Sequence, residues 1–203
     1  IKIGSIIPSK NIYPGMYLKD ESPETTHFSV ADKNGNVVSS TYTLNSTFGS
    51  GVVIKGTGII MNNEMDDFSA APGIPKQFGL LGAEANEIVP YKRPLSSMTP
   101  TIVMKDNELF FTTGSPGGSR IISAVLQSIL NIIDFDMDLE QATYAKRIHH
   151  QWQPDILEME LSIENEMKDS LETMGYEIEI KEPLTCVQTI MFDKDKYLSL
   201  IHI

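Results

Sequence analysis

The amino-acid sequence predicts an α+β fold in which antiparallel sheet is covered by layers of helix. Three observations predict it. Residues 27–44 and 101–113 each alternate between apolar and polar side chains around a hairpin turn, which is typical of half-buried strands. Residues 119–133 carry apolar side chains at helical spacing. Alternating segments return over 176–200, so the order is strands, helices, strands, and this order favours mixed layers over repeated strand–helix units.

The composition is that of an ordinary globular protein with an excess of acid. The 203 residues are 41% hydrophobic and 21% charged, which suffices for one sizeable core or two small ones. The net charge of −11 makes nucleic acid and anionic membranes poor partners. No apolar run reaches the length of about 18 residues that spans a membrane. The single cysteine, Cys186, excludes an internal disulfide. Because the sequence begins at Ile1 rather than Met, we expect a piece of a longer protein.

The first half of the chain is expected to hold a connector, one hairpin and a long loop. Residues 1–24 contain three prolines and little periodicity, which predicts an extended connector. Strands are expected over 27–31 and 37–44, joined by a glycine-containing turn, and a short apolar strand over 58–61. Residues 70–94 contain several prolines and glycines without a clear period. A loop of this length is typical of a lid or a binding loop.

The second half is expected to begin with a hairpin and to continue with helices. A helix over 119–133 is predicted because seven apolar residues recur there at helical spacing. No internal repeat or domain boundary is visible after residue 25. The other predicted elements are hairpin strands over 101–104 and 109–113, helices over 138–147 and 162–174 (the latter capped by Ser162, with Glu164 and Glu166 behind it), and strands over 176–180, 187–192 and 197–200.

Two adjacent threonines, Thr25 and Thr26, stand at the head of the first predicted strand. A threonine hydroxyl is a weak nucleophile unless a base takes its proton, and no His/Asp arrangement obviously serves Thr25. The first residue of a chain can supply that base itself, because an α-amine with a pKa of about 7.7–8.0 accepts a proton near neutral pH. Such chemistry requires cleavage between Glu24 and Thr25. The alternative interpretation is that the two threonines simply begin a strand.

Three further clusters could carry chemistry. Residues 41–49 gather hydroxyls and one amide at a strand end, and residues 62–68 place three acids and two amides directly after an apolar segment. Carboxylates gathered in this way can bind a metal or a substrate ammonium. Gly117 and Gly118 precede a helix, where exposed backbone N–H groups can form an oxyanion hole. The alternative interpretations are that residues 41–49 are simply the end of a strand, that residues 62–68 are a polar turn, and that the two glycines are an ordinary start of a helix.

Adjacent histidines, His149 and His150, invite a test for metal binding. Neighbouring side chains point in different directions on most backbones, and no third ligand has matching spacing in the sequence. We therefore expect both histidines to have a structural or packing role, and the sequence predicts no metal site.

Five long stretches carry these clusters in order: TTHFSVADKNGNVVSSTYTLNSTFGSG, NNEMDDFS, KRPLSSMTPTIV, GSPGGSR and RIHHQW. Taken together they resemble the gamma-glutamyltranspeptidase family. The resemblance runs from about residue 21 to residue 192, which is nearly the whole chain. Long motifs in the right order and at the right spacing make the combination more specific than any one cluster.

The resemblance implies a four-layer αββα sandwich of the N-terminal-nucleophile hydrolase type. It also implies a precursor that cuts itself before Thr25, so that residues 1–24 end a large subunit and residues 25–203 form most of a small, catalytic subunit. Thr25 would attack the carbonyl of Glu24 and then serve as the free N-terminal nucleophile. The implied activity is γ-glutamyl transfer and hydrolysis, with glutathione as a donor, water or an amino acid or peptide as acceptor, and no metal or cofactor.

Individual roles follow from the resemblance. Thr25 would attack the γ-glutamyl carbonyl, and Thr43 would hydrogen-bond to its amine or hydroxyl. The remaining implied roles are oxyanion binding by the N–H groups of Gly117 and Gly118, ammonium binding by Asn45, Glu64 and Asp67, α-carboxylate binding by Ser96 and Ser97, and a lid over the pocket formed by residues 72–78 with Phe78 as its aromatic gate.

Two departures from the family pattern bear on the activity of this chain by itself. The family's arginine that clamps the substrate carboxylate belongs to the large subunit, and residues 197–203 do not align with the family's C-terminal segment. The resemblance implies a periplasmic or extracellular location. Two rival functions remain. One is a glutaryl-type amide acylase, whose substrate has no ammonium for Glu64 and Asp67 to bind; the other is an uncleaved member that keeps only the fold.

Overall fold

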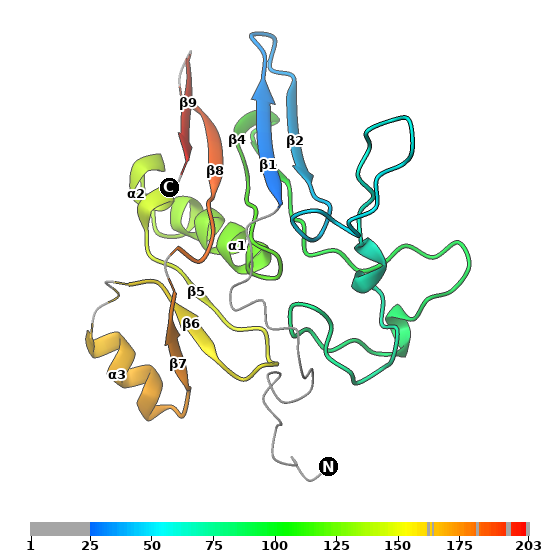
Figure 1. The fold of residues 1–203 in the computed structure, drawn as a ribbon. Helices are drawn as coiled ribbons and strands as arrows, with labels where there is room; N and C mark the ends of the chain where they lie inside the picture. Colours follow the sequence, from blue (N-terminus) through cyan, green and yellow to red (C-terminus); the bar gives the residue numbers. More distant parts are fainter. Residues whose placement is uncertain (1–24, 162, 164, 182, 194–195, 202–203) are drawn as a thin grey trace.

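The computed structural model describes residues 25–161, 163, 165–181, 183–193 and 196–201 (Figure 1). The connector predicted over 1–24, with Glu24 at the expected cleavage point, lies outside these residues, as do the predicted Ser162 cap and Glu164. Within the described part, no helix is long and apolar enough to cross a lipid bilayer.

The chain enters the described structure through a hairpin of two antiparallel strands. Strand β1 (Thr26–Ala31) pairs with β2 (Val37–Tyr42), and the register sets Thr26 opposite Tyr42. At the turn, the Asp32 carboxylate accepts hydrogen bonds from two backbone N–H groups, as Asp does in turns of this kind. The hairpin predicted from the alternating pattern is confirmed.

A four-stranded sheet forms the centre of the molecule, with strand order β3-β4-β8-β9 and antiparallel pairing throughout. The sheet confirms the predicted hairpin and both C-terminal strands. The segment over 197–203 was not expected to align with the family's C-terminal segment, but its described residues form the regular edge strand next to β8, and the expectation is wrong up to residue 201. The bounds are β3 (Thr101–Lys105), β4 (Glu108–Gly114), β8 (Gln188–Asp193) and β9 (Lys196–Ile201).

The two faces of strand β4 show how the layers are stacked. Thr112 faces the hairpin, where its hydroxyl lies 3.3 Å from that of Ser29. Phe111, the next residue back, points the other way and is fully buried in a core shared with helices α1 (Arg120–Ile133) and α2 (Leu139–Tyr144). Hairpin, central sheet and helices are therefore three successive layers, and Figure 1 shows them in this order.

The region after α1 contains more strand than the sequence predicts. Helix α2 begins at a capping box on Asp138 but ends at Tyr144, short of the predicted 138–147, because Ala145 is extended. Strands β5 (Ile148–His149) and β6 (Leu157–Met159) were missed, because two or three residues carry no readable period. The helix predicted over 162–174 is confirmed as α3 (Asn165–Thr173), and the strand predicted over 176–180 as β7 (Ile178–Ile180), which pairs parallel to β6.

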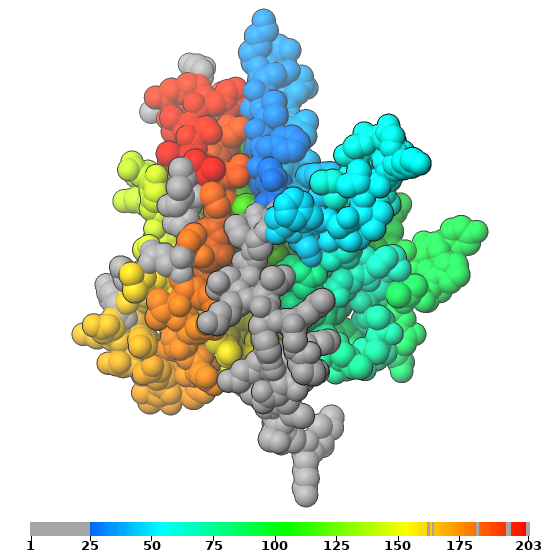
Figure 2. All heavy atoms as spheres, viewed as in Figure 1, coloured from blue at the N-terminus to red at the C-terminus, as the bar shows by residue number. Residues whose placement is uncertain are grey.

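Residues 43–100 form a lobe without α-helix or strand, seen in cyan to green at one side of Figure 2. The lobe contains two short 3₁₀ turns, η2 (Glu64–Asp67) and η3 (Glu84–Asn86). The predicted strand over 58–61 is wrong. Ile60 makes only an isolated bridge to Val53, because the chain reverses at the glycines between them and the ladder ends there.

Apolar side chains remain exposed on two elements. One side of α1 presents Ile122, Leu126 and Ile133, each about half exposed, although the opposite side of the helix is buried in the core. The outward face of the β1–β2 hairpin presents Phe28, Val30, Val38 and Tyr42. Exposed apolar surface gathered on whole faces of elements is typical of a surface that another chain covers.

Candidate active site

Thr25 lies immediately before β1 and is placed by the register of the hairpin. Because Thr26 pairs with Tyr42, the preceding residue faces Thr43, and the Thr25 hydroxyl donates a hydrogen bond of 3.1 Å to the Thr43 hydroxyl. Thr25 is only 9% exposed. The structure therefore brings together the two threonines that the sequence singled out, at a buried position and within hydrogen-bonding distance.

Asn45 continues this cluster. Its backbone N–H donates to the Thr43 hydroxyl at 2.8 Å, and its side-chain amide donates to the carbonyl of Asn63 at 3.4 Å. The Asn45 backbone has a positive φ of 72°, a conformation that asparagine adopts more readily than most residues. This turn carries the chain from the hairpin toward the acidic segment. The side-chain oxygen of Asn63, in that segment, holds the turn in place by accepting a hydrogen bond from the backbone N–H of Ser46 at 3.0 Å.

The acidic segment places two carboxylates against each other in turn η2. Burial, followed by a hydrogen bond to Asp67 and the charges of Asp67 and Asp66, raises the pKa of Glu64 to about 7. Burial also raises the pKa of Asp67, although the same hydrogen bond and the charge of Lys76 act in the opposite direction. The pair therefore shares a proton that rests on Glu64. One carboxylate oxygen of Glu64 is buried without a hydrogen-bond partner among the described residues.

Three consecutive residues fasten the predicted lid. The Lys76 ammonium donates to the carbonyl of Asp67 at 2.5 Å. The side chain of Gln77 bonds to Ser46 and Asn63, beside the threonine cluster. Phe78 is half buried, and its backbone carbonyl accepts a hydrogen bond from Gln151. The lid therefore contacts the acidic segment directly.

Gly117 and Gly118 form the turn between β4 and α1. Both have positive φ angles, 123° and 57°, which favour glycine. A Cβ atom on Gly117 would lie 2.7 Å from the hydroxyl oxygen of Thr185, so no larger residue fits without displacing that side chain. Gly114, three residues earlier, packs against the ring of His27, which follows Thr25 by two residues. The glycine turn therefore leaves the sheet beside the start of β1.

Ser96 and Ser97 are less closely tied to the other candidates. Ser96 is exposed, and its hydroxyl accepts a hydrogen bond from the backbone N–H of Met98. Asn86 connects the serine segment to the acids indirectly. Its side-chain oxygen accepts a hydrogen bond from the N–H of Leu95, next to Ser96, at 3.0 Å, and its side-chain nitrogen donates to the Asp67 carbonyl at 2.7 Å. In the part of the chain that the structure describes, no hydrogen bond joins either serine directly to the threonines or to the acids.

The candidates therefore form two groups that differ in how they are held. The strand group contains Thr25, Thr43, Gly117 and Gly118, which lie at the ends of sheet strands. The loop group contains Glu64, Asp67, Ser96 and Ser97, which lie in the lobe of residues 43–100. Asn45 and Asn63 connect the groups. Among the described residues, no set of three or more His, Cys, Asp or Glu side chains is arranged to hold a metal ion.

Sequence reasoning missed His27. It is 1% exposed, with its two ring nitrogens 2.9 Å from the hydroxyl of Thr41 and 3.1 Å from that of Ser29. Burial lowers the pKa of His27, so the ring is neutral at physiological pH. Its position two residues after Thr25, on the inward face of an alternating strand, was the available signal. The His149–His150 pair has the expected structural role, since His149 is buried and bonded to Ser123 and Gln151.

Comparison with known proteins decides the family. Residues 4–201 match the model of the gamma-glutamyltranspeptidase family. The chain is a member of that family. It is 50% identical over 195 residues to the glutathione hydrolase proenzyme of Escherichia coli, covering 96% of this chain. It spans 34% of that relative's length, about one third.

Solved gamma-glutamyltranspeptidases share the fold. An acivicin-inhibited gamma-glutamyltranspeptidase superposes with a TM-score of 0.81 at 49% identity, covering 87% of this chain and 96% of that chain. The enzyme from Pseudomonas nitroreducens complexed with L-DON gives a TM-score of 0.80 at 44% identity, covering 86% of this chain and 92% of that one. The chain accordingly has the N-terminal-nucleophile hydrolase fold predicted for the family, of which the described residues form three layers.

Proposed function

We propose that this chain is the catalytic part of a γ-glutamyl transferase and hydrolase that matures by cleavage between Glu24 and Thr25. Residues 1–24 would then end the large subunit, and residues 25–203 would form most of the small subunit. The observation that carries the proposal is the hydrogen bond from the hydroxyl of buried Thr25 to that of half-buried Thr43, at the start of the strand where the family resemblance places the nucleophile.

The chemistry follows from what cleavage does to Thr25. Before cleavage its nitrogen belongs to a peptide bond and cannot act as a base. The hydroxyl attacks the Glu24 carbonyl, the peptide C–N bond breaks, and water hydrolyses the resulting ester, which leaves Thr25 as a new N-terminus. Its free α-amine has a pKa near neutrality and can now take the hydroxyl proton when Thr25 attacks a donor. Thr43 holds the hydroxyl in place.

In the catalytic cycle, Thr25 forms an ester with the γ-glutamyl group, and the amine of the donor leaves with a proton. Water, or the amine of an amino acid or peptide, then releases the glutamyl group. The backbone N–H groups of Gly117 and Gly118 stabilise the tetrahedral oxyanion in each step. Glutathione is the proposed donor, and no residue in this scheme requires a metal or cofactor.

Substrate selection is assigned to the loop group. Glu64 and Asp67, with Asn45, would bind the α-ammonium of the glutamyl group, and Ser96 and Ser97 its α-carboxylate. Two carboxylates that share a proton in the ligand-free protein are suited to a cationic ligand, which allows both to ionise. This feature argues against the glutaryl-type amide acylase, because a glutaryl group offers no ammonium. Phe78 would close the pocket as part of the lid.

The proposed partner is the large subunit of the same precursor. The exposed apolar residues on α1 and on the β1–β2 hairpin are surfaces that such a subunit could cover. The arginine that clamps the substrate carboxylate would come from this subunit. A periplasmic or extracellular location is proposed from the family resemblance alone.

The decisive experiment compares the full-length precursor with its Thr25→Ala variant. We expect the natural precursor to give two subunits, the smaller beginning at Thr25 by N-terminal sequencing, and to hydrolyse a γ-glutamyl anilide. Thr25→Ala should give neither subunits nor turnover, and Thr25→Ser should cleave more slowly. Normal subunits from Thr25→Ala would show that the nucleophile is misassigned. An intact, inactive natural precursor would favour the non-catalytic rival.

A further inference from the structure

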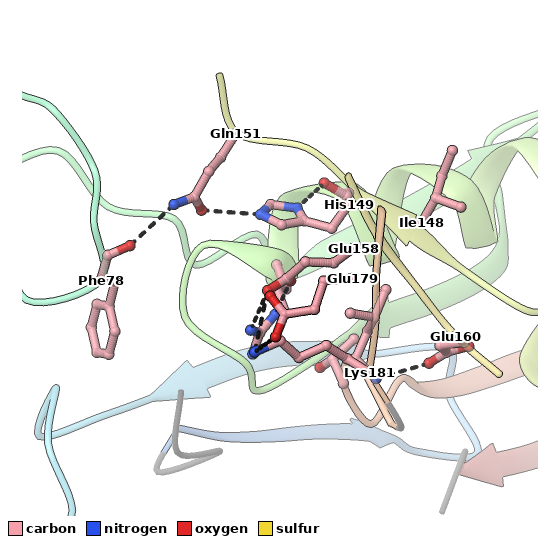
Figure 3. A network of polar contacts seen from close by, with 12 residues as sticks. Phe78, Ile148, His149, Gln151, Glu158, Glu160, Glu179 and Lys181 are labelled. Atoms are coloured by element: carbon pink, nitrogen blue, oxygen red, sulfur yellow. Dashed lines mark hydrogen bonds and ion pairs between the residues drawn. The ribbon is translucent and has the colours of Figure 1, made fainter. Parts of the chain in front are cut away.

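The side chain of Gln151 joins the lid to the loop between β5 and β6. Gln151, in the segment between β5 and β6, donates from its amide nitrogen to the backbone carbonyl of Phe78 at 3.1 Å (Figure 3). These residues are 73 positions apart in the sequence. The contact is made to the main chain of Phe78, so it fixes the path of the lid without using the aromatic side chain.

The hydrogen bonds around Gln151 determine its orientation. Its amide nitrogen has two protons, and both are used, one for Phe78 and one for the carbonyl of Gln153 at 3.1 Å. The amide oxygen faces the Nε2 of His149 at 3.0 Å. Since an amide oxygen can only accept, His149 carries its proton on Nε2. The Nδ1 of the same ring then accepts from the Ser123 hydroxyl at 2.7 Å.

This chain of bonds ends on rigid elements. Ser123 lies in the first turn of α1, just after the Gly117–Gly118 turn, and His149 is buried on β5. The same end of α1 is held to β6 by Arg120, whose guanidinium binds the Glu158 carboxylate with two hydrogen bonds of 2.5 and 2.8 Å. The loop that carries Gln151 is therefore held at both ends, by β5 and by β6, and both strands are bonded to α1. Through Gln151, the lid is held by the same elements.

The other lid contacts lead to a different part of the molecule. Lys76 and Gln77 bond to Asp67, Ser46 and Asn63, all within the lobe of residues 43–100. These partners belong to the same lobe as the lid itself. The bond from Gln151 leads instead to the loop after β5, which is bonded through His149 and Ser123 to the helix that follows the proposed oxyanion turn.

We propose that Gln151 is a positioning residue that holds the lid closed over the γ-glutamyl pocket, with His149 setting the orientation of its amide. The proposal rests on the proposed function, because it assigns a role in donor binding. Without the Gln151 bond the lid stays attached to the lobe but loses its fixed distance to the helical layer. The closed form is then less populated, and the apparent affinity for the donor falls in proportion.

Two variants separate this role from simple packing. Gln151→Leu removes all three hydrogen bonds at similar volume. Gln151→Glu keeps an acceptor for His149 but cannot donate to Phe78 at neutral pH, so it removes the lid contact while preserving the contact with β5. Gln153→Leu is the matched control, because Gln153 lies in the same loop and its side chain makes no hydrogen bond with any other described residue.

The first measurement does not depend on activity. Trypsin cuts after Lys76, in the middle of the lid, and it does so when the lid is open and the Lys76 ammonium has left the carbonyl of Asp67. In the processed full-length protein, we expect nicking between Lys76 and Gln77 to be about three to ten times faster for both Gln151 variants, the range expected when one neutral hydrogen bond is lost. The Gln153→Leu variant should match the natural protein.

The second measurement is steady-state kinetics on a γ-glutamyl anilide. We expect KM to rise about three- to tenfold in both Gln151 variants while kcat changes less than twofold, since the chemistry at Thr25 is untouched. A fall in kcat at constant KM, or a Gln151→Glu variant that behaves like the natural protein, overturns the proposal. Equal nicking rates overturn it regardless of kinetics. A natural protein with no turnover instead contradicts the proposed function, and the nicking ratio still tests the lid contact.

Discussion

The strand group and the loop group of the candidate site differ in what determines their geometry. Thr25 and Thr43 face each other because the strand register of one hairpin leaves no other arrangement. The turn η2 that carries Glu64 and Asp67 is held by individual side-chain bonds, since Lys76 and Asn86 both donate to the backbone carbonyl of Asp67. Chemistry that needs accuracy of a fraction of an ångström is thus assigned to the sheet, and recognition that tolerates adjustment is assigned to the lobe.

This difference predicts that changes in the strand group reduce the rate of the chemical step, whereas changes in the loop group reduce donor binding. The largest effect is expected at Gly117. An alanine there meets Thr185 at 2.7 Å and must keep a φ of 123°, so the turn has to shift. Loss of one oxyanion donor lowers kcat about 100- to 1000-fold. We expect a loss of this size for Gly117→Ala in assays with a γ-glutamyl anilide.

Gly35→Ala provides the matched control for Gly117. Gly35 also has a positive φ, 83°, but no atom lies within 4 Å of the position its Cβ would take. The variant should lose roughly 1 kcal/mol of stability from backbone strain and keep its activity. If Gly117→Ala behaved like Gly35→Ala, the glycine turn would have no part in the chemistry and the strand group would be reduced to the threonines.

The next largest effect is expected for Thr43→Val. This change removes the acceptor for the Thr25 hydroxyl and leaves the backbone N–H of Asn45 without its partner. Misplacing a reacting group can cost about 100-fold in rate, so loss of the bond that holds the Thr25 hydroxyl should lower kcat/KM roughly ten- to 100-fold, mostly through kcat. The unpaired N–H of Asn45 costs about 1–3 kcal/mol of folding stability instead. Thr43→Ser keeps the hydroxyl and should stay within a few-fold of the natural enzyme. A drop that appeared only in KM would contradict the distinction between the two groups.

An effect of similar size, but confined to KM, is expected for Asp67→Asn. A hydrogen bond between charged groups contributes about 1.5–3 kcal/mol, which corresponds to roughly a ten- to 100-fold increase in KM when the charge is lost. Cleavage of the precursor should be spared, because the Glu24–Thr25 peptide presents no ammonium at that point. Parallel gel analysis of cleavage and kinetics on a γ-glutamyl anilide would check both statements, and a variant that fails to mature would place Asp67 in the strand group's chemistry.

The shared proton of Glu64 and Asp67 makes donor binding depend on pH. Since the pKa of Glu64 is raised to about 7, the pair holds a proton below this pH and must release it to bind an ammonium. KM should therefore rise as the pH falls below about 7, by up to about tenfold per pH unit, and Glu64→Gln should flatten this dependence. If KM for the natural enzyme stayed constant between about pH 5 and pH 8, the assignment of the two acids to the substrate ammonium would be refuted.

The same raised pKa affects folding with a definite sign. The folded protein binds the Glu64 proton more tightly than the unfolded chain, whose ordinary value is 4.5. The resulting stabilisation is complete below that value and is lost as the pH rises through about 7. The Glu64→Gln variant cannot ionise at this position, so it does not lose folding stability as the pH rises. The ligand-free variant should therefore melt at a higher Tm than the natural protein at alkaline pH, although it binds the donor less well.

The smallest effect is expected for Ser96→Ala. Its exposed hydroxyl accepts one hydrogen bond from Met98, so Tm should change by less than a degree or two and stability by less than about 0.5 kcal/mol. KM for the donor should rise about threefold through the lost carboxylate contact. A change in kcat larger than this would move Ser96 out of the loop group.

How far the sequence could predict the molecule follows the same division. The helix at 120–133 and the hairpins were predictable because burial imposes a period on their side chains. Strands β5 and β6 were not, because pairing partners that are distant in the sequence define them. The acids of η2 could be recognised as a cluster, but the bonds that place them, from Asn86 and Lys76, depend on the path of an aperiodic loop.

Tyr197, near the end of the chain, donates a hydrogen bond from its hydroxyl to the carbonyl of Asp32 in the first hairpin, at 2.8 Å. Strand β1 also packs on β8, so the first strand of the described chain contacts strands that are made much later. During synthesis the hairpin leaves the ribosome first and has no sheet to settle on until β8 and β9 follow. The proposed cleavage before Thr25, if it needs the nucleophile held in this arrangement, therefore waits until the ribosome has made β9, so an incompletely made sheet leaves the precursor uncut.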